Sequence, residues 1–106
     1  MKRERPPMPS RLDGIINEVV VELRRANEKF PEFPTDPVHA AAIVAEEAGE
    51  LVRESLQATY EKPWDWVETK KEAIHVAAMA LRFLVMMHRM TKRPSPQVTE
   101  ETTNAE

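Results

Sequence analysis

Apolar residues recur at helical spacing in the first half of this chain. Between residues 12 and 30 they lie three and four positions apart, at Leu12, Ile15, Ile16, Val19, Val20 and Leu23. This spacing places the apolar side chains on one face of an α-helix, while the other face is charged. The pattern therefore predicts an amphipathic helix from about Leu12 to Phe30.

Prolines separate this first helix from a second one. The segment Pro31 to Thr35 contains two prolines, which lack a backbone donor and restrict the preceding residue, so it cannot continue the helix. Asp36 and Pro37 then read as an N-cap followed by proline at the first helical position. We expect the second helix to reach about Tyr60, before Pro63. Its inward residues should be Ala41, Val44, Leu51, Val52 and Leu56.

A third helix is expected to begin between Trp64 and Glu68 and to reach about Met90. From Ala73 to Met87 its only polar residues are His75 and Arg82. A helix that is apolar nearly all round needs cover on several sides, and two helices of the same subunit cover it poorly. The stretch is too short and too interrupted for a membrane span, so we expect no membrane partner. Burial in a helical homo-oligomer is the favoured interpretation, and the core helix of a monomer is the alternative.

The predicted fold is therefore all-α, an antiparallel bundle of about three helices completed by homo-oligomerisation as a dimer or tetramer. With 106 residues the chain has room for one domain, expected at residues 11–91. Residues 1–10 and 92–106 are rich in proline and polar residues and are expected to be unstructured tails.

Composition excludes several classes of function. A net charge of −3 gives no general attraction to a nucleic acid duplex or an anionic membrane. The absence of cysteine excludes disulfides, zinc–thiolate sites and a thiol nucleophile. The basic N-terminus is followed by no apolar segment of the kind found in secretory signals, so a cytoplasmic location is expected.

Two acidic motifs carry the candidate chemistry. The first is Glu46-Glu47-Ala48-Gly49-Glu50, and the second is Glu72-Ala73-Ile74-His75 on the next helix. Residues three apart share a helical face, so Glu47 with Glu50 and Glu72 with His75 form two pairs that antiparallel packing can bring together. Several carboxylates suit a hard cation such as Mg²⁺, which completes its shell with water and substrate phosphates. The motifs therefore indicate phosphate chemistry.

The order of these motifs resembles the MazG-like all-α nucleoside triphosphate pyrophosphohydrolases. Similarity extends from about Leu12 to Met90, and His75 stands where the family pattern has aspartate. The resemblance implies a helical homo-oligomer that binds Mg²⁺ through Glu47, Glu50 and Glu72. It also implies cleavage of an NTP or dNTP into the monophosphate and pyrophosphate, and Mn²⁺ is an alternative cation.

Other roles stay open at the level of sequence. Glu46 or Glu54 is a candidate to accept the proton of an attacking water. His75 is either a metal ligand, which would favour Mn²⁺ or a softer cation, or a hydrogen-bonded core group. The non-enzymatic alternative is a helical oligomer or interaction module that binds nucleotide or metal without turnover.

Four further residues are candidates for substrate binding. Lys29 ends the first helix, where a cation also complements the helix dipole, and His39 begins the second, where it either touches phosphate or caps a turn. Trp64 and Trp66 are candidates to stack on a nucleobase, or to pack in a core or interface.

Overall fold

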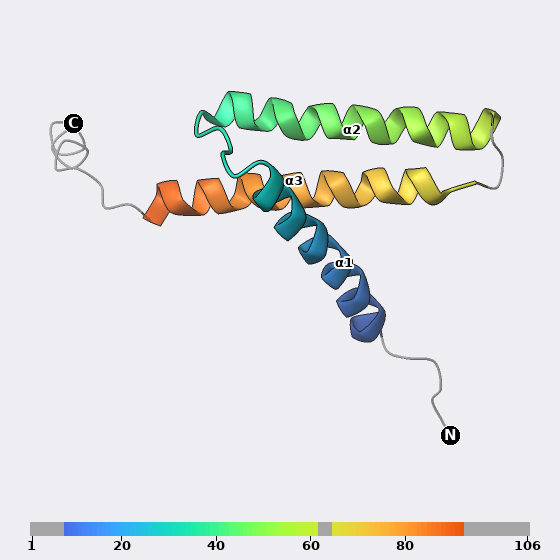
Figure 1. Cartoon of the computed structure of the whole chain (residues 1–106), viewed down its shortest axis with the longest axis horizontal. Helices are drawn as coiled ribbons and strands as arrows, with labels where there is room; N and C mark the ends of the chain where they lie inside the picture. The colour runs from blue at the N-terminus through green and yellow to red at the C-terminus, as the bar shows by residue number, and fades with distance from the viewer. Residues whose placement is uncertain (1–7, 62–64, 93–106) are drawn as a thin grey trace, which may run out of the picture.

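The computed structural model describes residues 8–61 and 65–92, which form three α-helices (Figure 1). The first helix, α1, spans Met8–Lys29, the second, α2, spans Pro37–Tyr60, and the third, α3, spans Val67–Lys92. These two ranges contain no strand. The predicted all-α class is therefore confirmed.

The helix boundaries follow the residues that were expected to set them. The Asp36 side chain accepts a hydrogen bond of 3.1 Å from the backbone N–H of His39, and Pro37 takes the first helical position of α2. The start of α1 at Met8 lies four residues before the predicted one, so three residues assigned to the N-terminal tail are helical. Lys92, assigned to the C-terminal tail, is the last residue of α3, and the other residues of both predicted tails fall outside 8–61 and 65–92.

Helix α3 is the element that holds the other two helices. It packs along α2 and against α1, whereas α1 and α2 make no packing contact with each other in the described chain. Helices α2 and α3 run antiparallel and side by side, and α1 crosses away from α3 at a steep angle (Figure 1). A site built from all three helices must therefore lie on α3.

The buried core of the described chain is small and consists mainly of alanine. The buried apolar residues are Ala26, Ala40, Ala58, Ala78 and Met86. Buried alanines let helices approach closely but bury little apolar area. On α2 the expected inward set is corrected at three positions, because Ala41, Val52 and Leu56 are exposed and Ala40 and Ala58 are buried instead.

The connector between α1 and α2 is tied to α3 by Arg82. This side chain is buried, it donates a hydrogen bond to the carbonyl of Phe30, and its guanidinium carbon lies 4.8 Å from the centre of the Phe33 ring. Burial lowers the pKa of the Arg82 guanidinium from its ordinary value, although arginine stays charged in proteins. Among the described residues no carboxylate forms an ion pair with Arg82, so the carbonyl and the ring are its main partners.

By length and composition alone, the segment Val67–Thr91 is apolar enough to cross a membrane. A single helix of this kind is weak evidence of a membrane span, because the core helices of soluble proteins pass the same test. Polar side chains with partners elsewhere in the protein interrupt the segment, among them His75, which faces Glu47 of α2, and Arg82, which binds the connector between α1 and α2.

We predict that Arg82→Ala lowers the free energy of unfolding by about 2–3 kcal/mol, because it removes a hydrogen bond from a charged donor and a cation–π contact. Urea denaturation followed by circular dichroism at a fixed protein concentration measures the change. The matched control is Arg89→Ala, an exposed arginine on the same helix, which should stay within about 0.5 kcal/mol of the wild type. Equal losses in the two variants would contradict the anchoring role of Arg82.

Candidate metal centre

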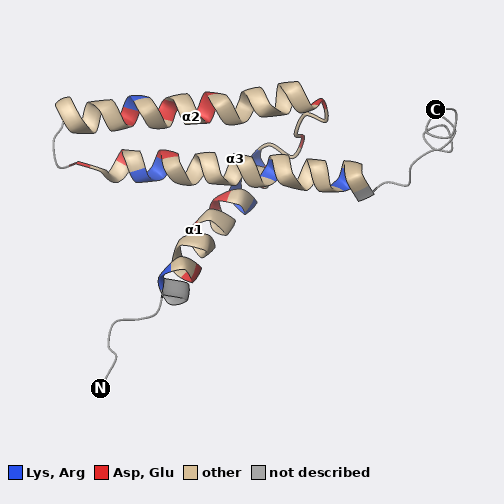
Figure 2. Ribbon diagram, turned by 180° about the vertical axis from the view of Figure 1, so that it is seen from behind, with Lys and Arg blue, Asp and Glu red and all other residues tan. Residues whose placement is uncertain are grey.

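Three potential metal ligands from α2 and α3 lie close together. The Nδ1 atom of His75 is 3.3 Å from Oε1 of Glu72 and 3.9 Å from Oε1 of Glu47. One ligand atom from each residue lies within 4.8 Å of the other two. The three-residue spacing puts Glu72 and His75 on one face of α3, and the antiparallel packing of α2 brings Glu47 to that face. Figure 2 shows the acidic part of α2 beside the part of α3 that carries its own acidic residues.

The group is partly withdrawn from solvent. The exposed fraction of the side chain is 18% for Glu72, 24% for His75 and 33% for Glu47. Carboxylates in such a setting need a partner or a cation to offset the lost hydration. This partial burial distinguishes the group from the solvated acidic faces that most helices carry.

A fourth residue, Glu22 of α1, reaches the other side of the imidazole. Its Oε2 atom lies 3.5 Å from Nε2 of His75, and its side chain is only 15% exposed. Both of its oxygens accept hydrogen bonds from Arg25, at 2.9 and 2.7 Å. Glu22 was not predicted from the sequence, although a signal was present: it lies three residues after Val19 and four before Ala26, on the apolar face of α1.

The carboxyl groups around His75 have opposite pKa shifts. The hydrogen bonds from Arg25 lower the pKa of Glu22, and this effect outweighs the opposing effect of burial. Burial raises the pKa of Glu47; the attraction of His75 opposes the shift, and the negative charges of Glu72 and of the other glutamates near it reinforce it. Of Glu22 and Glu47, it is therefore Glu47 whose ionised form the fold disfavours, and a cation bound beside it would offset this effect.

The other predicted ligand and the two predicted proton acceptors lie outside this group. Glu50 pairs with Arg53 one turn further along α2. Glu46 is exposed, and Glu54 is half-buried, with its backbone carbonyl accepting a hydrogen bond of 3.3 Å from the Thr69 hydroxyl. Of the acidic residues singled out on α2, the structure brings Glu47 alone to His75.

The predicted substrate-binding residues are dispersed. His39 is exposed in the first turn of α2, eight residues and about 12 Å along the helix from Glu47. Lys29 lies at the end of α1, with its amine 5.5 Å from the centre of the Phe30 ring. Trp66 is about half exposed just before α3, and Trp64 lies outside the described residues.

A hollow of about 520 Å³ adjoins the His75 group between α1 and α3. Its lining combines acidic, basic and apolar side chains, namely Glu18, Val21, Glu22, Arg25, Lys71, Ile74 and His75. Arg25 and Lys71 therefore bring positive charge next to the cluster. A phosphate chain bound through a metal needs acidic ligands for the cation and basic side chains for its own oxygens.

The chemistry of the three groups fits a divalent transition ion. Two carboxylates and one imidazole favour Mn²⁺, or a softer cation such as Zn²⁺, more than an all-oxygen set would. Mg²⁺ prefers oxygen ligands, so it would rely on the two carboxylates and on water or phosphate. These three ligand groups support a metal centre, and the imidazole of His75 shifts the expected cation from Mg²⁺ towards Mn²⁺ or Zn²⁺.

Comparisons of the chain with protein-family profiles, with curated proteins and with solved structures found no match.

We predict that Glu47→Gln raises the melting temperature of the metal-free protein at neutral pH. The substitution removes a carboxylate whose ionised form is disfavoured by burial. The gain should shrink as the pH falls through the raised pKa of Glu47, because the wild-type carboxyl then takes up a proton. The same variant should lose the stabilisation that Mn²⁺ gives the wild type.

Thermal unfolding followed by circular dichroism, with and without Mn²⁺, checks both effects. Glu28→Gln, at an exposed position of α1, is the control and should respond to Mn²⁺ as the wild type does. An unchanged Mn²⁺ response in Glu47→Gln would remove Glu47 from the centre.

Proposed function

We propose that this chain is a metal-dependent nucleotide pyrophosphohydrolase of the MazG-like all-α type, acting on an NTP or dNTP. The observation that carries the proposal is the convergence of Glu47, Glu72 and His75 on one point between α2 and α3. All three residues belong to the two acidic motifs, and Glu47 and Glu72 stand at positions where the resemblance places metal ligands. The third occupies the position of the family aspartate.

Each group in the site has a role in this proposal. Glu47, Glu72 and His75 hold the cation, Mn²⁺ or Mg²⁺. When bound, the metal neutralises phosphate charge and lowers the pKa of a water molecule. Glu50 lies one turn from Glu47, and breaking its ion pair with Arg53 would free its carboxylate for the same cation.

The hollow beside His75 supplies charge for the phosphate chain. Lys71 lines it with 60% of its side chain exposed and can turn towards a bound anion, and Arg25 adds positive charge to the hollow from its position on Glu22. The ion pair of Lys71 with Glu68 is long, at 3.9 Å, and contributes little because it is exposed. Guanidinium and ammonium groups at this position would stabilise the pyrophosphate as it leaves.

The proposed reaction is attack of water on the α-phosphorus with loss of pyrophosphate. The bond between the α-phosphorus and the oxygen that bridges to the β-phosphorus breaks, and the water proton passes to a carboxylate. Glu46 and Glu54 both stay candidates for that carboxylate. Glu46 adjoins Glu47 in the chain, and Glu54 lies on the same helical face two turns later.

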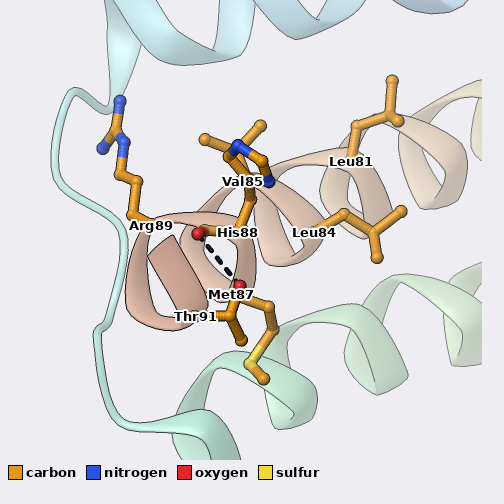
Figure 3. Close-up of a pocket in the computed structure, with 7 residues that line it drawn as sticks. All are labelled: Leu81, Leu84, Val85, Met87, His88, Arg89 and Thr91. Carbon is orange, nitrogen blue, oxygen red and sulfur yellow. Dashed lines mark hydrogen bonds between the residues drawn. The ribbon is translucent and has the colours of Figure 1, made fainter. Parts of the chain in front are cut away.

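We also propose that the chain works as a homo-oligomer. Large apolar side chains are exposed on all three helices; on α1 they include Leu12, Ile15 and Ile16, each about half exposed. On the second half of α3, Leu81, Leu84 and Met87 leave the helix in different directions around a hollow of about 520 Å³ (Figure 3). The core of one described chain buries mainly alanine, so a second copy is the simplest cover for these surfaces.

We predict that the protein releases pyrophosphate from at least one nucleotide in a panel of NTPs and dNTPs assayed with Mg²⁺ and with Mn²⁺. Glu47→Gln and Glu72→Gln should each lower turnover at least about 100-fold, because loss of metal charge stabilisation is a change of several kcal/mol. Circular dichroism should show unchanged helix content, and Glu28→Gln should keep wild-type turnover. Metal and nucleotide binding without pyrophosphate release would favour the non-catalytic alternative.

We predict an oligomer at micromolar concentration, measured by light scattering coupled to size exclusion. Ile16→Glu, which puts a charge on the exposed apolar face of α1, should shift the population towards monomer. Asp13→Glu, a conservative change at an exposed position of the same helix, should leave the measured mass of the oligomer unchanged. A monomeric wild type would show that the apolar surface has another role.

A further inference from the structure

His75 lies between acidic groups that approach its two ring nitrogens from different helices. Its Nδ1 atom faces Glu72 and Glu47, at 3.3 and 3.9 Å. Its Nε2 atom faces Glu22 of α1, at 3.5 Å. The two nitrogens of this imidazole are therefore in different surroundings, one beside the proposed metal ligands and the other beside a carboxylate outside that group.

An imidazole that binds a metal does so through one nitrogen and keeps a proton on the other. The protonated nitrogen is usually held by a carboxylate or carbonyl, which fixes the ring orientation and makes the bound nitrogen a better donor. In His75 the nitrogen that faces away from Glu47 and Glu72 has a carboxylate oxygen, Oε2 of Glu22, 3.5 Å away.

We propose that Glu22 is the positioning residue of the metal centre, accepting the Nε2–H of His75 so that Nδ1 binds the cation beside Glu47 and Glu72. This inference rests on the metal site of the proposed function and extends it to α1. It assigns a role to a residue outside both acidic motifs. It also explains how a histidine can serve where the family pattern has an aspartate.

Arg25 completes the arrangement by fixing Glu22. Its Nε and Nη2 atoms each donate to a different oxygen of the carboxylate, which restrains the carboxylate plane. The oxygen that accepts from Nη2 of Arg25, Oε2, is also the one that lies 3.5 Å from Nε2 of His75, so Arg25 holds it beside the imidazole. Glu22 and Arg25 lie three residues apart on α1, so the helix itself sets their alignment.

Other carboxylates on α1 do not have this geometry. Glu18 lies one turn before Glu22, is 47% exposed, and forms an ion pair with Lys70 of α3 at 3.4 Å. It carries the same charge and bridges the same two helices without an ion pair to His75. Glu18→Gln is therefore a matched control for the loss of one negative charge near the centre.

The experiment compares the wild type, Glu22→Gln and Glu18→Gln by calorimetric titration with Mn²⁺. We expect Glu22→Gln to bind Mn²⁺ about 10–100-fold more weakly, the usual cost of removing a partner behind a metal-bound histidine. Glu18→Gln should keep nearly the wild-type affinity. Arg25→Gln should weaken binding in the same direction by a smaller factor, and it provides a second test if Glu22→Gln is poorly folded by circular dichroism.

A spectroscopic measurement separates positioning from a merely structural role. In the Zn²⁺-loaded wild type with ¹⁵N-labelled histidine, NMR should identify Nδ1 of His75 as the metal-bound nitrogen and Nε2 as the protonated one. Zn²⁺ is the probe because it is diamagnetic. Binding through Nε2 would overturn the inference.

The outcomes for this inference and for the proposed function differ. If Glu22→Gln matches Glu18→Gln in Mn²⁺ affinity while Glu47→Gln does not bind, the metal centre stands and the role of Glu22 is refuted. If the wild type binds neither Mn²⁺ nor Zn²⁺, both proposals fall. Pyrophosphate release by the wild type, without any effect of Glu22→Gln on metal affinity, would support the proposed function and refute the role of Glu22.

Discussion

Packing of α3 against both other helices is the contact on which the rest of this structure depends. Helices α1 and α2 do not pack on each other in the described chain, so their relative positions are set through α3. The two polar residues in the apolar stretch of α3 mark its junctions with these neighbours. Arg82 holds the connector between α1 and α2, and His75 faces one glutamate on each of those helices.

Burial and neighbouring charges disfavour the ionised form of Glu47 in the His75 group. Three glutamates lie within 4 Å of one imidazole, each with no more than a third of its side chain exposed. Glu22 is neutralised by Arg25, whereas Glu47 has no basic partner other than His75 among the described residues, and its pKa is raised. A small domain with an alanine core has little stability to offset such repulsion, which favours a functional reason for the arrangement.

Local signals were enough to predict the helices and part of the site. The Asp36-Pro37 start of α2 was correct because capping depends on neighbouring residues alone. The pairing of Glu72 with His75 follows from their spacing. Glu22 was missed because its contact with His75 depends on the angle at which α1 crosses α3.

The side-chain orientation of Glu50 was not predictable either, because Arg53 lies at the same three-residue spacing and forms an ion pair with it. Val52 and Leu56 are exposed because another side of α2 packs against α3. Apolar residues occur around most of α2, so the sequence does not indicate which side that is.

The histidine at position 75 is consistent with these charges. An aspartate there would place a fourth carboxylate among Glu22, Glu47 and Glu72, and like charges at such distances strongly disfavour joint ionisation. An imidazole can instead donate its Nε2–H to one glutamate while presenting Nδ1 to the other two. His75 in α3 and the Glu22–Arg25 pair in α1 therefore act together, because each charged or polar group offsets the desolvation of its neighbours.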